Sequence, residues 1–277
     1  MLPKMIIQSN KAKICIEGFN KEIPFIYEYI PSVSVKSKDL EDIFLTKQDP
    51  ILHFQYSNKF HLLLEYPKAD IATDDYIETV ALAEHLLERR REEQRVYCLH
   101  SSAVSKKERG IVFFGGITDI GKTTLAMKLA EKGFYFISDE KTLLEDTKIV
   151  GGVQYIKLRK GWQNKYGRGI VHASKLFNMK ETVDLSLFVV PYIDNGRKET
   201  KKWDSAKFFW HLQEELSRKI RGGSRLINHQ TQLAPCIDTE LLSMQRISYA
   251  KEISKKIKCY AIRGTPDQII ASIEGLL

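Results

Sequence analysis

The pattern of apolar and polar positions changes near residue 73. Before that point, short apolar runs alternate with turn residues: IIQS, KICIEGF, EIPFIYEYI, ILHFQYS and KFHLLLEYP, the last of which ends on Pro67. Runs of this length between turn residues are typical of strands. We therefore expect the first part of the chain to form a small, mostly antiparallel sheet.

The next segment, DDYIETVALAEHLLERRREEQ, repeats its apolar residues near helical spacing. They follow an Asp-rich start, as is common at helix N-termini, and are Ile77, Val80, Ala81, Leu82 and Leu86. This pattern predicts a long helix over about residues 75–93. We interpret its mixed-charge end, residues 88–93, as a solvated surface.

Strand and helix patterns then alternate. VYCLHSSAV, IVFFGG and FYFISDE are typical of strands, and KTTLAMKLAEKG of a helix between the second and third of them. Later segments predict further strands at VGGVQYIKL, VDLSLFVVPYI and IKCYAIRG, and an amphipathic helix at SAKFFWHLQEELSRKI. Thr265, Pro266 and Gln268 have the spacing of a capping box that begins a closing helix.

This order of elements indicates an α/β protein. We expect a smaller β-rich α+β domain over residues 1–92, and a nucleotide-binding domain over residues 93–277 with a mixed central sheet flanked by helices. The 277 residues, 43% of them apolar, are enough for two such cores.

Charge is divided unevenly between the two predicted domains. Residues 1–92 carry 12 Lys and Arg against 15 Asp and Glu, a net of −3, and residues 93–277 carry 31 against 20, a net of +11. A basic domain suits phosphate-bearing ligands, an acidic partner or nucleic acid, and scattered solvated lysines give the same count. No zinc-finger spacing, aromatic RNA-binding pattern or heptad repeat supports nucleic acid.

The cysteines and the N-terminal segment indicate a soluble, cytoplasmic protein. Cys15, Cys98, Cys236 and Cys259 are far apart and form no C-x-x-C pair, so neither a zinc site nor a disulfide framework is predicted. The N-terminal segment MLPKMIIQSNKAK lacks the apolar stretch of a signal peptide, and no run approaches the ~18 apolar residues of a membrane span.

One segment matches the phosphate-loop pattern G-x-x-x-x-G-K-[ST] in full. It comprises Gly116, Ile117, Thr118, Asp119, Ile120, Gly121, Lys122 and Thr123. The strand IVFF precedes it and a helix follows it, so backbone N–H groups converge on one place that suits a polyphosphate. The alternative is a chance match in a glycine-containing turn.

This context predicts a purine nucleoside triphosphate site, with Mg-ATP as the ligand. Lys122 would reach the β and γ phosphates, and Thr123 would supply a hydroxyl ligand to Mg²⁺. Thr124 would add a hydroxyl to the α phosphate.

Acidic and imidazole groups follow neighbouring strands. Asp139 and Glu140 end FYFISDE, at the sheet edge where ligands bind in open α/β folds. A carboxylate there can hold Mg²⁺ or take a proton from a hydroxyl, or Asp139 can simply cap a turn. His100 ends the preceding strand pattern, where it could contact a phosphate or orient Asp139, or serve structure alone.

A basic, glycine-containing turn follows the predicted helix that ends near Ile220. Arg221 and Arg225 are candidates there for contacts with a phosphate or an acceptor. Cations and glycine are equally common where a helix simply ends. Trp162, Trp203 and Trp210 are interpreted as core or interface residues.

The segments HSSAV and GIVFFGGITDIGKTTLAMKLAEKGFYFISDE together resemble the HPr kinase/phosphorylase family, whose nucleotide-binding fold is related to that of phosphoenolpyruvate carboxykinase. The likeness covers about residues 96–145 and continues more loosely through YGRGIVHASKLF and CYAIRGTPDQIIASIEGLL. It implies an oligomeric, ATP-dependent serine kinase with Asp139 as general base and His100 beside it.

The chain departs from the family pattern in three ways. Asp119 stands where a small residue is usual, and Asp tolerates a positive φ. Glu140 replaces the second Asp of an acidic pair, so it could hold metal or partner His100. Asn164, Lys165 and Tyr166 replace the acid and arginine before the glycine-rich segment, where the family performs phosphorolysis.

The leading hypothesis is therefore a kinase that transfers the γ-phosphoryl group of Mg-ATP to a serine of a peptide or protein. A small hydroxylated metabolite is the alternative acceptor. Two other classes stay open: a nucleotide-gated regulatory module, and a nucleic-acid-associated ATPase that would bind RNA or DNA in a salt-sensitive way.

Overall fold

The structure, a computed structural model, describes residues 4–19, 26–37, 45–115, 120–167, 169–194, 197–221 and 236–277. The chain divides into two compact units. Unit 1 comprises residues 1–97 and 216–245, and unit 2 comprises residues 98–215 and 246–277. Residues 216–221 and 236–245 thus belong to unit 1, whereas the predicted second domain spans residues 93–277.

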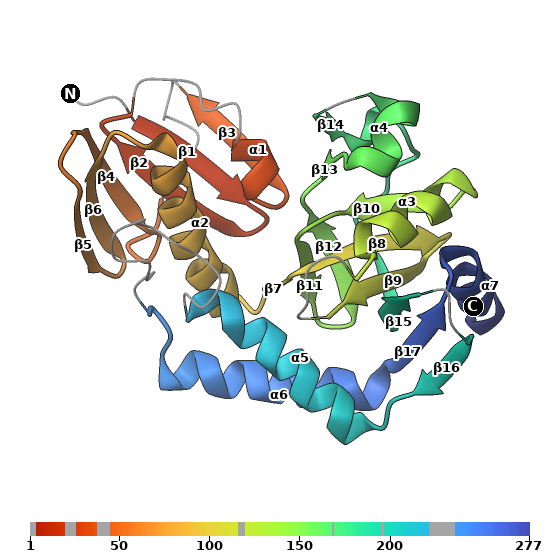
Figure 1. Cartoon of the computed structure of the whole chain (residues 1–277). Helices are drawn as coiled ribbons and strands as arrows, with labels where there is room; N and C mark the ends of the chain where they lie inside the picture. Colours follow the sequence, from red (N-terminus) through yellow and green to blue (C-terminus); the bar gives the residue numbers. More distant parts are fainter. Residues whose placement is uncertain are drawn as a thin grey trace. The chain divides into compact units, whose positions relative to one another are not determined.

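Unit 1 contains a six-stranded sheet in the order β3-β1-β2-β4-β6-β5 (Figure 1). Its strands are β1 (Lys4–Ser9), β2 (Ala12–Glu17), β3 (Val33–Ser37), β4 (Ile51–Tyr56), β5 (His61–Glu65) and β6 (Lys68–Thr73). β4 runs parallel to β2 and β6, and the three other pairings are antiparallel. The mostly antiparallel sheet that the apolar runs predicted is confirmed.

The run EIPFIYEYI is not the strand that was expected, because its described part contains the short helix α1 (Ile26–Tyr29). Ile26 and Ile30 are both buried, and the Ile30 amide donates to the Ile26 carbonyl oxygen at 2.9 Å. Residues four apart share one face of a helix, whereas periodicity alone cannot separate a short apolar strand from a short buried helix.

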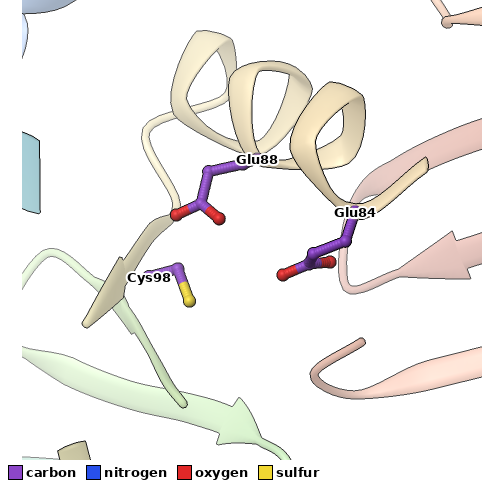
Figure 2. Close-up of side chains that lie close together, drawn as sticks. All are labelled: Glu84, Glu88 and Cys98. Carbon is purple, nitrogen blue, oxygen red and sulfur yellow. The ribbon is translucent and has the colours of Figure 1, made fainter. Parts of the chain in front are cut away.

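Helix α2 (Tyr76–Glu93) has the predicted bounds and begins at Asp75, whose Oδ1 accepts the Ile77 amide at 2.7 Å. The solvated end expected at residues 88–93 is wrong for most of its charges: Glu88, Arg90, Arg91 and Glu92 are buried. Arg91 donates to Glu84 at 2.9 Å, and Glu84 and Glu88 leave one face of the helix (Figure 2). A helix end with charges of both signs can be buried when its acidic and basic side chains pair with opposite charges.

Unit 2 is built on a mixed sheet in the order β10-β8-β9-β15-β12-β11-β7, with β17 also beside β15 and β16 beside β17. The strands are β7 (Tyr97–Leu99), β8 (Ser101–Lys106), β9 (Arg109–Phe114), β10 (Tyr135–Ser138), β11 (Thr142–Glu145), β12 (Lys148–Gly152), β15 (Val183–Ile193), β16 (Glu199–Lys202) and β17 (Lys258–Gly264). β15 runs parallel to β9 and β17. The segment VYCLHSSAV therefore forms two strands, β7 and β8, which break at His100.

Helices cover both faces of this sheet. The core cluster on one face joins α3 (Lys122–Glu131) and α7 (Pro266–Leu276) to strand residues such as Phe113. Phe114 points the other way, as adjacent residues in a strand do, and meets Phe208 of α5 (Ser205–Ile220) with ring centroids 5.9 Å apart. The capping box of Thr265 and Gln268 begins α7 as predicted. The helix α6 (Glu240–Lys256) was not predicted.

A small module follows β12 in the chain. β13 (Tyr155–Lys157) and β14 (Ile170–His172) pair as a separate two-stranded sheet, with α4 (Lys160–Tyr166) between them in sequence and a short 3₁₀ helix, Ala173–Lys175, after them (Figure 1). Among the described helices, none combines the length and apolar character needed to span a bilayer.

Candidate functional site

The candidate site begins where β9 gives way to α3. Four residues of the predicted phosphate loop, Gly116, Ile117, Thr118 and Asp119, lie outside the described residues. The described remainder, Ile120 to Thr124, lies at the start of α3, in the strand–loop–helix order that the pattern requires.

Gly121 occupies the position before α3 in the left-handed conformation, with φ of 93°. A Cβ atom at this position would lie 2.0 Å from Cδ1 of Ile193, at the end of β15. Glycine is thus favoured by the backbone angle, and a larger residue would also displace the Ile193 side chain. The turn it makes starts α3 with Lys122, Thr123 and Thr124.

Lys122 and Thr123 turn their polar groups toward neighbouring elements. The Lys122 side chain is buried, and its Nζ donates to the Gly115 carbonyl oxygen at 3.4 Å. Thr123 Oγ1 donates to Asp139 Oδ1 at 2.9 Å. The first turn of α3 thereby presents an ammonium group and a hydroxyl that is already paired with a carboxylate.

Asp139 follows β10 and is the most buried acid of the site, with 2% of its surface exposed. Its Oδ1 also accepts a hydrogen bond of 2.5 Å from Oγ of Ser102, on the neighbouring strand β8. Its backbone N–H donates to the Val153 carbonyl oxygen at 2.8 Å. Two hydroxyls and the backbone therefore fix this carboxylate beneath the first turn of α3.

Burial raises the pKa of Asp139 to about 6 from its ordinary 3.8. The nearby charge of Glu140 acts in the same direction, and the hydrogen bonds from Ser102 and Thr123 oppose it. A carboxyl group with a pKa near neutrality is suited to accept a proton in catalysis.

Glu140 has a left-handed backbone, with φ of 62°, which is uncommon for a residue with a side chain. Its carbonyl oxygen lies 3.0 Å from Nδ1 of His100, and its Oε2 lies 3.6 Å from the same nitrogen. The two predicted residues are therefore neighbours, as expected for a Glu140 that partners His100. The contact of His100 with a phosphate or with Asp139 stays a prediction.

A pocket of about 130 Å³ opens beside these groups. Its lining comprises His100, Ile120, Gly121, Lys122, Thr123, Thr124, Glu140, Lys157, Arg159 and Trp162. Seven of these ten were predicted as site residues. Asp139 does not line the pocket, and it lies behind Thr123.

Four residues escaped the sequence analysis. Ser102 lies in a predicted strand, and nothing in the sequence of that strand indicates that its serine would contact Asp139. Lys157 and Arg159 flank the apolar Leu158, an alternation that marks two cations on one side of an extended segment. Trp162 was interpreted as a core or interface residue, and it both packs in the core and lines the pocket.

Of the two arginines predicted in the basic turn after α5, the structure describes Arg221. Arg221 lies in unit 1, where its Nε donates to Asp238 at 3.0 Å and its guanidinium also reaches Ser243. Arg225 lies outside the described residues. The contact of Arg221 with a phosphate or an acceptor stays a prediction.

Comparisons with known proteins find a partial likeness among solved structures. No protein-family model and no curated protein matches the chain. Among solved structures, the HPr(Ser) kinase/phosphatase from Coxiella burnetii matches with 18% sequence identity over 38% of this chain and 70% of that chain, at a TM-score of 0.28. A likeness at this score supports no statement about activity. The family resemblance of residues 96–145 thus stays a prediction.

Proposed function

We propose that this chain is a phosphotransferase that binds Mg-ATP beside the first turn of α3 and transfers the γ-phosphoryl group to an acceptor hydroxyl. The observation that carries the proposal is the hydrogen bond between Thr123 and Asp139, next to Lys122. A hydroxyl at the start of the loop helix, facing an acid on a neighbouring strand, is how phosphate-loop enzymes hold Mg²⁺.

The oxygen atoms at this position fit Mg²⁺, which prefers hard carboxylate and hydroxyl oxygens. Thr123 and one of the two carboxylates, Asp139 or Glu140, would hold the ion. When bound, Mg²⁺ neutralises charge on the phosphate chain. Lys122 would contribute a second positive charge at the β and γ phosphates.

Transfer requires one general base. The oxygen of the substrate hydroxyl forms a bond to the γ phosphorus. The bond from that phosphorus to the β–γ bridging oxygen breaks, and ADP leaves with the electron pair. The hydroxyl proton passes to a carboxylate of the protein. We assign this role to Asp139, because burial has raised its pKa toward the pH at which a base both accepts and later releases a proton.

One observation favours the reverse assignment, in which Glu140 is the base and Asp139 is the metal ligand. Glu140 lines the pocket with His100, whereas Asp139 lies behind Thr123 in direct contact with the expected metal ligand. Glu140 would then take the proton and Asp139 would hold Mg²⁺. The acceptor is the same in both assignments: a serine of a peptide or protein first, and a small hydroxylated metabolite second.

Magnesium dependence separates the two assignments. A variant of the metal-side carboxylate should need more Mg²⁺ for half-maximal transfer and should recover with excess metal. A variant of the base should lose kcat at every Mg²⁺ concentration. Asp139→Asn and Glu140→Gln, titrated side by side, should therefore give opposite patterns, and identical patterns would refute a division of labour.

The transfer itself is tested with γ-labelled ATP, Mg²⁺ and a cell extract as the source of acceptors. Wild type should label an acceptor, and Lys122→Ala should abolish both labelling and ATP binding. Lys128→Ala, a control in the last turn of the same helix, should bind ATP as wild type does. Label that appears only as inorganic phosphate would indicate a hydrolytic, regulatory ATPase, and unchanged ATP binding in Lys122→Ala would refute the phosphate site.

A further inference from the structure

The pocket beside α3 has a second basic side, which no phosphate-loop pattern includes. Besides Lys122, the described lining contains Lys157 at the end of β13 and Arg159 immediately before α4. Glu140 is the one acid in that described lining. The lining therefore carries three cations against one anion, a balance that suits a strongly anionic ligand.

The local backbone directs these two cations to one side. Ile156 and Leu158 are buried, whereas Lys157 and Arg159 are exposed. In an extended segment alternate residues point to opposite sides, so Lys157 and Arg159 share the side opposite the core. The Leu158 amide donates to the Gly169 carbonyl oxygen at 3.0 Å, which keeps this segment paired beyond β13.

The module that carries the two cations is fixed to α3. Lys165 and Tyr166, at the end of α4, each donate to Oε1 of Glu131 in the last turn of α3, at 2.5 Å. Ile156 and Leu158 belong to the same core cluster as the buried leucines of α3. The position of Arg159 relative to the first turn of α3 is thus set by packing and by hydrogen bonds.

We propose that Lys157 and Arg159 bind the phosphate chain of the nucleotide, together with the groups that the first turn of α3 supplies. The inference rests on the proposed function. Arg159 suits this role because its planar guanidinium can donate two parallel hydrogen bonds to one phosphate, and Lys157 adds a point charge. The backbone oxygen of Arg159 accepts the amides of Trp162 and Gln163, so the first turn of α4 holds the arginine in place.

Isothermal titration of ATP tests this second side. Lys157→Gln and Arg159→Gln should each raise the Kd for ATP by about tenfold, and the double variant by on the order of a hundredfold. Arg159→Lys should fall between wild type and Arg159→Gln, because it keeps the charge and loses the planar fork. The control Lys175→Gln removes an exposed lysine from the 3₁₀ helix of the same module and should change Kd by less than about twofold.

The salt dependence of ATP binding distinguishes phosphate binding by Lys157 and Arg159 from a purely structural role of these residues. If the two cations meet phosphate charges, the dependence of log Kd on log salt concentration should become shallower in the double variant. Both substituted side chains are exposed, so thermal unfolding should stay at the wild-type midpoint. A double variant that binds ATP within twofold of wild type, or that changes only the KM of an acceptor, overturns the proposal.

The same measurements distinguish failure of this proposal from failure of the proposed function. Weaker ATP binding in the variants, together with no phosphoryl transfer by wild type, would support the second side and refute the kinase. Wild-type protein that binds no triphosphate would refute both. Transfer activity with unchanged nucleotide affinity in the double variant would refute the second side alone.

Discussion

Replacing Asp139 with asparagine should stabilise the protein while it removes phosphoryl transfer. The pKa of this carboxyl group is about 6 in the folded chain and 3.8 ordinarily, mainly because burial disfavours its charged form. The two values differ by about 2, and one pKa unit corresponds to ~1.36 kcal/mol. At pH 7.5 the buried charge therefore lowers the free energy of unfolding by roughly 3 kcal/mol, an upper bound.

The direction of the pH dependence follows from the raised pKa. Between about pH 4 and pH 6 the folded state binds more protons at Asp139 than the unfolded state does, so stability falls as the pH rises through this window. Above about pH 7 both states are charged and the difference is constant. Asparagine has no such charge, so the advantage of the variant should grow from pH 4 to pH 6 and then stay level.

The expected gain is smaller than the upper bound. Oδ1 of asparagine can still accept from Ser102 and Thr123, but its NH₂ group needs an acceptor in a buried place, which costs about 1–3 kcal/mol when none is found. We therefore expect the free energy of unfolding at pH 7.5 to rise by up to about 2 kcal/mol.

Urea unfolding of wild type and Asp139→Asn, without Mg²⁺ or nucleotide and at several pH values from 4.5 to 8, measures this difference. Glu140→Gln is the matched control, because the Glu140 side chain is half exposed and its removal should change stability by less than about 0.5 kcal/mol. A variant less stable than wild type at pH 7.5, or an equal difference at pH 5 and pH 7.5, would refute burial as the dominant influence on Asp139.

Three further substitutions test the fold around the site and in unit 1. Gly121→Ala should lower the free energy of unfolding by about 2–4 kcal/mol and weaken ATP binding, because a methyl group there would meet Ile193 and alanine disfavours the left-handed backbone; thermal unfolding and titration measure both. Glu84→Gln should lower it by up to about 3 kcal/mol, because Arg91 would lose its closer carboxylate partner at 2.9 Å and keep Glu88 at 3.6 Å; urea unfolding measures the change. Thr265→Ala should lower it by about 1 kcal/mol through loss of the cap of α7, measured in the same way.

Two of these changes, Gly121→Ala and Glu84→Gln, have a control in a helix. Gly161→Ala in α4 meets nothing within 4 Å and should be neutral or slightly stabilising. Glu252→Gln removes one partner of an exposed pair with Lys256 and should change stability by less than about 0.5 kcal/mol. If Glu84→Gln were as mild as Glu252→Gln, the buried pair would contribute no more than a surface pair.

The elements that the sequence predicted well are those whose signals are local. The bounds of α2 follow from apolar spacing and an Asp at its start, and the cap of α7 follows from three residues within four positions. The helix α6 was missed because its apolar residues gather on no single face, so periodicity could not indicate it. The burial of Arg91 was missed because partners such as Ser9 are distant in sequence.

The same contrast between local and distant signals applies to the candidate site. Lys122, Thr123 and Asp139 could be predicted because a spacing pattern fixes the first two, and the third comes directly after the next strand. Ser102 and Arg159 could not, because their role depends on which strand lies beside β10 and on how α4 packs against α3. A local pattern can therefore predict the groups at the start of the proposed nucleotide site, whereas the residues that surround them are set by packing.

This division bears on where specificity resides. A phosphate loop is common to enzymes with many substrates, so it cannot by itself distinguish them. The module from β13 to β14 brings Lys157, Arg159 and Trp162 to the same pocket, and none of these belongs to the loop pattern. If the second basic side binds phosphate, Trp162 is the pocket's large apolar surface and is available to a nucleobase or an acceptor, so substitutions at Trp162 should change substrate preference more than phosphate affinity.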